Sequence, residues 1–205
     1  IPLSFQKKQL KFFGVPKASA KLYTENKFIG STLRGGDCNV ESVLFIPHCH
    51  MTHTECVGHI VHENIFVNQF PVNGLRSAGL ITIIPSTSNK NDKFCTDDFL
   101  ITGKLVEKAL MLFPYPVEVL VVRTLPNDSS KLTKVYSETD VPPYFSLDAI
   151  ECLKQNKIEH LCIDLPSLDR TNDGGFLASH HLFWDVPLGE KSLKDKAPSS
   201  RTITE

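Results

Sequence analysis

Histidines crowd one short stretch of this sequence. Four of the eight histidines lie between His48 and His59, in the segment P-H-C-H-M-T-H-T-E-C-V-G-H, and a fifth is His62. Nitrogen, sulfur and carboxylate donors at intervals of two to five residues are the ligand set of zinc or manganese. Without such a partner, clustered imidazoles make a poor core, because each buried ring nitrogen needs a hydrogen bond. The stretch therefore predicts a metal site.

Two kinds of metal site fit these residues. One is a closed structural zinc site, because Cys49, His53, Cys56 and His59 spell C-x3-H-x2-C-x2-H. The other is an open catalytic site of histidine and glutamate ligands, in which one coordination position stays available for water. The pattern favours the open site, because a chain of 205 residues needs no zinc staple and the closed site leaves Glu55 without a role.

The local geometry of a strand would bring several of these side chains together. Side chains alternate along a strand, so His53 and Glu55 would project to one face. A turn at Gly58 would then let His59 point into the same space. This part of the chain is therefore expected to supply several groups to one site.

A second group of chemistry-bearing residues lies near the C-terminus, in I-D-L-P-S-L-D (163–169) and S-H-H-L-F-W (179–184). The adjacent His180 and His181 are candidate ligands, although such a pair is often an ordinary surface feature. Asp164 and Asp169 flank Pro166, an arrangement typical of turns.

Proline and glycine divide the chain into short segments of alternating type. Apolar and β-branched runs predict strands at 43–47, 80–85, 117–123 and 160–163, of which 117–123 is the clearest buried strand. Capping residues and apolar spacing predict helices at 97–113 and 146–156. We further expect a strand within 1–24, a hairpin or loop at 28–38, a polar loop at 86–93, a strand or helix end at 182–186, and a mobile loop at 191–200. This order predicts a single α/β domain over residues 1–205 with a mixed β-sheet.

Composition argues against two classes of protein. The 22 basic and 23 acidic residues leave a formal charge of -1, which offers no footprint for nucleic acid or an acidic membrane surface. No apolar run reaches the roughly 18 residues of a membrane-spanning helix. The six cysteines form no C-x2-C pair, which favours reduced thiols and a cytoplasmic location. The chain begins at Ile1 without a methionine, which leaves a removed targeting peptide open.

Three blocks, in this order, are similar to the cyclase / kynurenine formamidase-like family. T-H-T-E-C-V-G-H (52–59) resembles the metal-binding signature H-x-G-T-H-x-D-x-P-x-H, with histidine, acid and histidine at matching positions. Residues 145–169, which end in D-L-P-S-L-D, and the following S-H at 179–180 resemble a helix and strand that lead to a ligand histidine. R-T-I-T-E (201–205) is similar to the strand that supplies the last glutamate ligand.

The resemblance implies a swivelling β/β/α (cyclase-like) fold, with a mixed sheet, a smaller sheet and flanking helices, and with further strands expected after Glu205. It implies a metal-dependent amidohydrolase with one or two Zn²⁺ or Mn²⁺ ions, and a homo-oligomer, either dimer or tetramer. The implied substrate is a small-molecule aryl formamide or a related cyclic or aryl amide, as in tryptophan catabolism. The alternative is a non-catalytic or degenerate member that acts as a metal-stabilised binding protein.

Roles carried over from the family fall on named residues. The implied metal ligands are His48, His53, Glu55, His180 and Glu205, with Cys49, His50 and His181 as alternatives. His59 matches the catalytic histidine. Apart from the family roles, three aromatic residues are candidate walls for an aryl substrate, with ordinary core packing as the alternative for each: Phe66, Phe70 and Trp184.

The sequence also departs from the family pattern. Glu55 stands where the family has aspartate, so its carboxylate is one methylene further from the backbone. Met51 replaces a glycine, and a methionine cannot cheaply adopt a positive φ. These departures, together with Cys49 and the early chain end, are what motivate the non-catalytic alternative.

Overall fold

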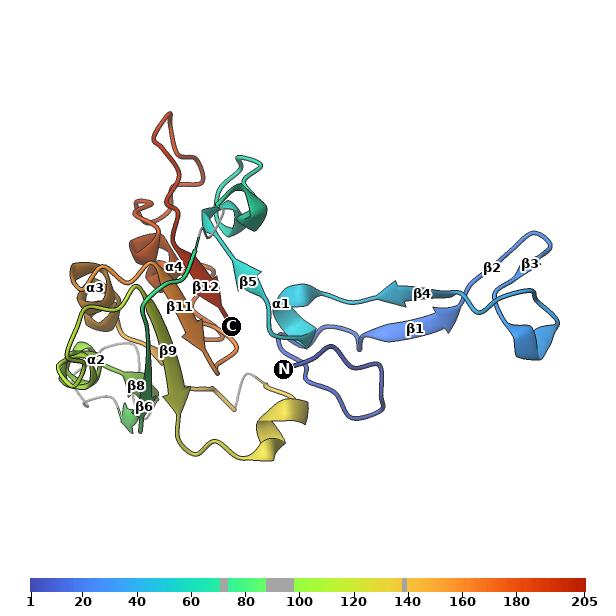
Figure 1. Cartoon of the computed structure of the whole chain (residues 1–205), viewed down its shortest axis with the longest axis horizontal. Helices are drawn as coiled ribbons and strands as arrows, with labels where there is room; N and C mark the ends of the chain where they lie inside the picture. Colours follow the sequence, from blue (N-terminus) through green and yellow to red (C-terminus); the bar gives the residue numbers. More distant parts are fainter. Residues whose placement is uncertain (71–73, 88–97, 138–139) are drawn as a thin grey trace. The chain divides into compact units, whose positions relative to one another are not determined.

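The computed structural model of the protein describes residues 1–70, 74–87, 98–137 and 140–205 (Figure 1). The chain divides into two compact units. Unit 1 comprises Ile1–Thr52 and Ser129–Ser137, and unit 2 comprises His53–Asp128 and Glu138–Glu205. This division does not decide how many domains the protein has, so the single domain stays a prediction.

Unit 1 is built on two short antiparallel ribbons. Strand β1 (Ser19–Leu22) pairs with β4 (Glu41–Leu44), and β2 (Thr24–Glu25) pairs with β3 (Phe28–Ile29). The strand predicted at 43–47 thus lies slightly earlier, because Pro47 starts the one-turn helix α1 (Pro47–His50). The short helices η1 (Thr32–Arg34) and η4 (Ser129–Thr133) complete the unit.

Unit 2 contains a mixed five-stranded sheet in the order β5-β12-β11-β9-β6. Its strands are β5 (Thr54–Glu55), β12 (Thr202–Thr204), β11 (His160–Ile163), β9 (Val119–Thr124) and β6 (Ala78–Ile83). Strands β6, β9, β11 and β12 run parallel, whereas β5 is antiparallel to β12. A smaller sheet has the order β10 (Tyr144–Phe145), β8 (Phe99–Ile101) and β7 (Ser86–Thr87). The predicted mixed α/β architecture is confirmed.

Three helices lie together on one side of the large sheet in Figure 1. They are α2 (Gly103–Leu110), α3 (Leu147–Gln155) and α4 (Ala178–Phe183), and α3 packs against both of the others. Their apolar faces meet alternate residues of the strands, so Leu120 of β9, Leu161 of β11 and Ile150 of α3 are fully buried. Each such side chain contributes about 1.5–3 kcal/mol of burial free energy. This core fixes the ends of the strands that carry the site.

The prediction of a helix at 97–113 is wrong about where the helix begins. Residues Phe99–Ile101 form strand β8, and the helix starts only at Gly103. Pairing with β10 and β7 satisfies the backbone of this segment, so the tertiary context overrides the helical spacing of its apolar residues. The predicted helix cap at Thr96 or Asp97 and most of the predicted polar loop lie outside the described residues.

Other predictions are confirmed, with small shifts. The predicted strand at 160–163 coincides with β11, and the predicted helix at 146–156 is α3 with Ser146 at its N-cap. Strand β6 is buried on one face only, because its side chains alternate between core and solvent. Residues 182–186 are the end of a helix, since α4 extends to Phe183.

Two further expectations concern helices and thiols. Within the described ranges, no helix is long and apolar enough to cross a membrane. The five cysteines that the structure describes are all free thiols, and those at 49 and 56 are buried.

Candidate metal centre

Two glutamates meet where β5 pairs with β12. Glu55 ends β5 opposite Ile203, and Glu205 follows the last residue of β12. The backbone N–H of His53 donates to the carbonyl of Glu205, and the N–H of Glu205 donates back, both at 3.0 Å. This antiparallel register sets the two carboxylates side by side, and helix α4 adds His180 to them. Ligand atoms of Glu55, His180 and Glu205 all lie within 4.8 Å of one another.

His180 lies at the centre of this group. Its Nε2 is 3.0 Å from Oε1 of Glu55 and 3.6 Å from Oε1 of Glu205, while its Nδ1 is 2.5 Å from Oδ2 of Asp169. The residue is 1% exposed, and its ring packs 5.4 Å from the ring of Trp184, centroid to centroid. The imidazole is therefore held in one orientation, with each nitrogen facing carboxylate oxygens.

His53 and His59 approach the other oxygen of Glu55. Oε2 of Glu55 is 3.9 Å from Nε2 of His53 and 3.6 Å from Nδ1 of His59. His59 ends the short helix η2 (Val57–His59), and the predicted turn depends on Gly58, where a Cβ would lie 2.0 Å from the carbonyl oxygen of Ile65. The side chain of His59 is 30% exposed, unlike that of His180. His59 is thus the histidine of this group that reaches solvent.

The electrostatics of the group are those of crowded buried carboxylates. Burial raises the pKa of Glu205 to about 7, although the nearby His180 acts in the opposite direction. Burial alone would lower the pKa of His180, but its hydrogen bonds to Asp169, Glu205 and Glu55 raise it well above the ordinary value. Three acidic side chains surround one imidazole here, so the site carries more negative than positive charge.

These residues fit a divalent cation. A cation would balance the buried carboxylates, and imidazole with carboxylate is the donor set of zinc, manganese and related metals. Glu55 presents one oxygen towards His180 and the other towards His53 and His59, an arrangement that suits a bridging carboxylate. The individual ligand roles stay predictions.

Four further residues are predicted ligands: His48, and as alternatives Cys49, His50 and His181. His48, Cys49 and His50 belong to α1 in unit 1. Both ring nitrogens of His50 are hydrogen-bonded to backbone, with Nδ1 accepting from the N–H of Ile46 and Nε2 facing the carbonyl of Pro16, each at 2.9 Å. The Nδ1 of His181 lies 3.2 Å from the carbonyl of Val186, away from Glu55. The ligand role predicted for His48 stays a prediction.

The cysteines of the closed-zinc hypothesis are buried thiols. Burial raises the pKa of Cys49 and of Cys56. The thiol of Cys56 also donates a hydrogen bond to the carbonyl of Ile65 at 3.6 Å. The choice between the open histidine–glutamate site and the closed zinc site stays a prediction.

The three predicted aromatic walls have different surroundings. Trp184 is buried behind His180, and its Nε1 donates to the carbonyl of Arg201 at 2.9 Å. Phe70 lines a separate pocket of about 360 Å³ with Arg76, Glu159 and His160 among its other residues. Phe66 is exposed, and its contact with a substrate stays a prediction.

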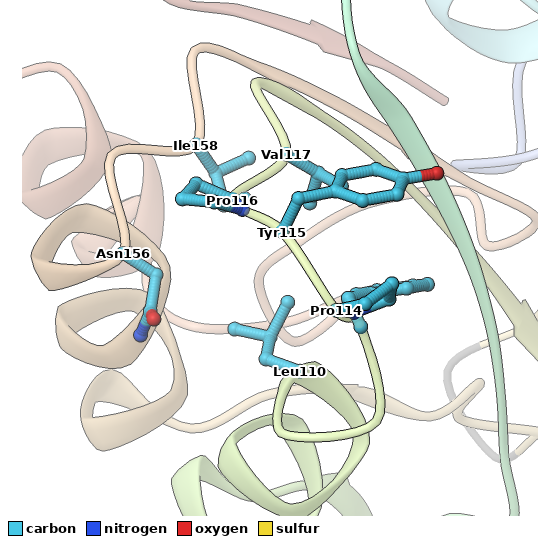
Figure 2. Close-up of a pocket in the computed structure, with 8 residues that line it drawn as sticks. Leu110, Pro114, Tyr115, Pro116, Val117, Asn156 and Ile158 are labelled. Carbon is cyan, nitrogen blue, oxygen red and sulfur yellow. The ribbon is translucent and has the colours of Figure 1, made fainter.

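A further pocket, of about 300 Å³, lies between the ends of α2 and α3 (Figure 2). It is lined mainly by apolar residues, among them Leu110, Pro114 and Ile158, and the amide of Asn156 donates to the carbonyl of Cys152. This lining offers no metal ligand of the histidine or carboxylate type. The pocket is therefore distinct in chemistry from the group around His180.

Sequence reasoning missed Asp169 and misjudged Met51. Asp169 is buried against His180, whereas its spacing is typical of a turn. No spacing rule joins the two, because the residues between them form an irregular segment. Met51 has φ -157° and ψ 162°, which is extended backbone open to any residue, so the expected conflict with a positive φ is wrong.

Comparisons with known proteins bear on the family and the fold of the chain. The family model named Cyclase matches residues 4–170 of the chain. The fold is similar to the structure of a "predicted metal-dependent hydrolase from Bacillus stearothermophilus", with a TM-score of 0.56 and 13% identity over 100% of this chain and 78% of that chain.

Two other solved structures have a similar fold. A "potential metal-dependent hydrolase with cyclase activity" gives a TM-score of 0.52 and 14% identity, over 100% of this chain and 78% of that chain. Isatin hydrolase A from Labrenzia aggregata, bound to benzyl benzoate, gives a TM-score of 0.51 and 13% identity. The match covers 85% of this chain and 74% of that chain. A comparison of the sequence with curated proteins gives no match.

Proposed function

This chain belongs to the Cyclase family, and we propose that it is a metal-dependent hydrolase that cleaves the C–N bond of an aryl formamide or of a related cyclic or aryl amide. The observation that carries the proposal is the buried group of Glu55, His180 and Glu205, with a partly exposed histidine beside it. A structural site would need only the buried ligands. The exposed histidine adds a group that can exchange protons with a substrate.

The proposed ligands of Zn²⁺ or Mn²⁺ are His53, Glu55, His180 and Glu205. A bound divalent cation lowers the pKa of a water ligand towards about 7 and polarises a carbonyl oxygen. The chain shields these ligands from bulk water, because His180 and Glu55 are buried and the buried ring of Trp184 packs against the ring of His180.

His59 is the proposed proton carrier. Its Nδ1 lies 3.6 Å from Oε2 of Glu55, which orients the ring, and its side chain is 30% exposed. A histidine in this position can take a proton from water and give it to the leaving nitrogen, because its ordinary pKa lies near neutrality. The carboxylate of Glu55 lies near both histidines, with Oε2 3.9 Å from Nε2 of His53 and 3.6 Å from Nδ1 of His59.

The substrate class rests on resemblance and on the names of similar structures. The family resemblance suggests aryl formamides. Isatin, which the name of one similar structure mentions, is a cyclic aryl amide. In both an aryl formamide and isatin, the amide nitrogen is bonded to an aromatic ring, so both belong in the first assay.

The test combines metal analysis with hydrolysis. Protein stripped with a chelator is reloaded with Zn²⁺ or Mn²⁺, its metal content is measured by elemental analysis, and hydrolysis of N-formylkynurenine and of isatin is followed. We expect one or two equivalents of metal and turnover that depends on it. Metal without turnover of any aryl or cyclic amide would contradict the hydrolase, and absence of bound metal would contradict the proposed site.

A matched variant separates this proposal from the closed zinc site. Replacing Cys49 and Cys56 together by serine removes both thiols of that hypothesis and leaves the histidines and glutamates intact. We expect this double variant to keep its metal and most of its turnover. Loss of metal in the double variant, with metal retained in the wild type, would favour the structural zinc module instead.

A further inference from the structure

Asp169 is the buried residue behind the metal centre. It follows β11 in the chain, is 7% exposed, and places Oδ2 2.5 Å from Nδ1 of His180. Its Oδ1 accepts the backbone N–H of Ser179 at 2.8 Å, and its Oδ2 also accepts the backbone N–H of His180 at 3.2 Å. Both carboxylate oxygens are therefore already committed to donors.

We propose that Asp169 is a positioning residue that holds a proton on Nδ1 of His180 and thereby keeps Nε2 available as a metal ligand. The inference rests on the proposed function, since it assigns His180 as a ligand. The distances carry it: Nδ1 faces Asp169 at 2.5 Å, and Nε2 faces Glu55 at 3.0 Å on the opposite side of the ring. A metal-ligating histidine commonly donates its second N–H to a carboxylate in this way.

Only a side chain whose two terminal atoms both accept hydrogen bonds fits this position. The N–H groups of Ser179 and His180 approach the two oxygens from the start of α4. An asparagine at residue 169 would have to turn its NH₂ group towards one of these N–H groups. If its oxygen kept the bond to Ser179, the NH₂ would face Nδ1 of His180 and donate to it. The imidazole proton would then move to Nε2, the atom needed by the metal.

The loop that carries Asp169 is itself anchored. The N–H of Asp169 donates to Oγ of Ser167 at 3.3 Å. The next residue, Arg170, donates from Nε to Oδ2 of Asp98 at 2.8 Å, and the hydroxyl of Tyr144 donates to the same oxygen at 2.9 Å. Asp169 therefore reaches His180 from a fixed backbone, as a positioning role requires.

The test compares Asp169→Asn with Asp169→Ala. Nitrogen-15 NMR of the imidazole in metal-free protein, recorded at a pH above the raised pKa of His180 so that the ring carries a single proton, reports whether Nδ1 holds that proton. A zinc titration gives the affinity. Asp164→Asn is the matched control, because Asp164 lies on the same loop and accepts from the N–H and hydroxyl of Thr124 at 2.9–3.1 Å.

We expect a protonated Nδ1 in the wild type and an unprotonated Nδ1 in Asp169→Asn. Zinc affinity should fall by about 10- to 100-fold in Asp169→Ala, and further in Asp169→Asn, where the wrong ring nitrogen carries the proton. Asp164→Asn should keep the wild-type signal and affinity. A merely structural role predicts the opposite order, because asparagine preserves the volume of aspartate and alanine does not.

Several outcomes would overturn the inference. An unprotonated Nδ1 in the metal-free wild type would do so even if neither variant folds. An Asp169→Asn protein that binds zinc more tightly than Asp169→Ala would do so as well. A wild type that binds no zinc would refute the proposed metal centre, whereas the NMR signal would still show separately whether Asp169 holds the proton.

Discussion

The two short helices that carry paired histidines show how differently one side chain can be used. In α1, His50 is bound through both ring nitrogens to backbone groups of Ile46 and Pro16. In α4, both ring nitrogens of His180 face carboxylates instead. Hydrogen bonds to backbone groups fix a histidine to the local chain. Carboxylate partners add negative charge, and buried negative charge is stabilised by a cation.

His181 makes the same comparison within a single helix. It is as buried as His180, but its Nδ1 faces the carbonyl of Val186 at 3.2 Å. Neighbouring histidines therefore differ in their partners because their side chains leave the helix in different directions. Burial alone does not distinguish the two histidines, whereas the partners of the ring nitrogens do.

The largest effect should come from His180→Ala. This change removes the only side chain among the described residues that contacts Glu55, Asp169 and Glu205 together. Because metal activation is worth several kcal/mol, we expect loss of bound metal and a fall in kcat/KM of about 1,000-fold or more. Elemental analysis and initial rates measure both. Full metal content in this variant would refute the ligand role of His180.

His59→Ala should have the next largest effect. If His59 carries protons without binding metal, the variant should retain its metal while turnover falls by about 100-fold or more. The measurement is kcat alongside metal content. A variant that loses its metal would show that His59 is a ligand and would weaken the comparison with the buried His180.

His50→Ala should change stability and leave the metal centre intact. The substitution removes the partners of the N–H of Ile46 and the carbonyl of Pro16. Backbone groups left without a partner cost about 1–3 kcal/mol. Chemical denaturation should show this loss at unchanged metal content. Loss of metal with unchanged stability would assign His50 to the metal site.

Asp185→Asn should give the smallest effect, and one that depends on pH. Partial burial acts to raise the pKa of Asp185, but hydrogen bonds from Lys154 and Arg201 bring it below the ordinary 3.8. The carboxylate therefore stabilises the fold above that value, and the stabilisation disappears as the pH falls through the lower folded pKa.

The side chain of Asp185 is more than half exposed, so the wild type should be more stable than Asp185→Asn by about 1 kcal/mol or less at neutral pH. Thermal melting of both proteins at pH 7 and near pH 3 measures the difference. A gap that persists unchanged at the lower pH would refute an ionic origin.

The amino-acid pattern alone predicted the class of site and much of the fold. Strand alternation placed His53 and Glu55 on one face, and the turn at Gly58 placed His59 beside them. The strand at 117–123 and the helix at 146–156 also follow from local spacing. These features are local, because strand period, turn geometry and capping involve residues only a few positions apart.

The family resemblance named His180 and Glu205 as ligands, but local spacing did not, and only the tertiary structure shows how these distant groups meet. Glu205 joins Glu55 through the pairing of β12 with β5, two strands 150 residues apart at their paired threonines, Thr54 and Thr204. Asp169 reaches His180 across an irregular segment, and β8 replaces the start of a predicted helix because other strands pair with it. Such contacts depend on how elements pack, and no short-range spacing encodes the packing partner of a residue.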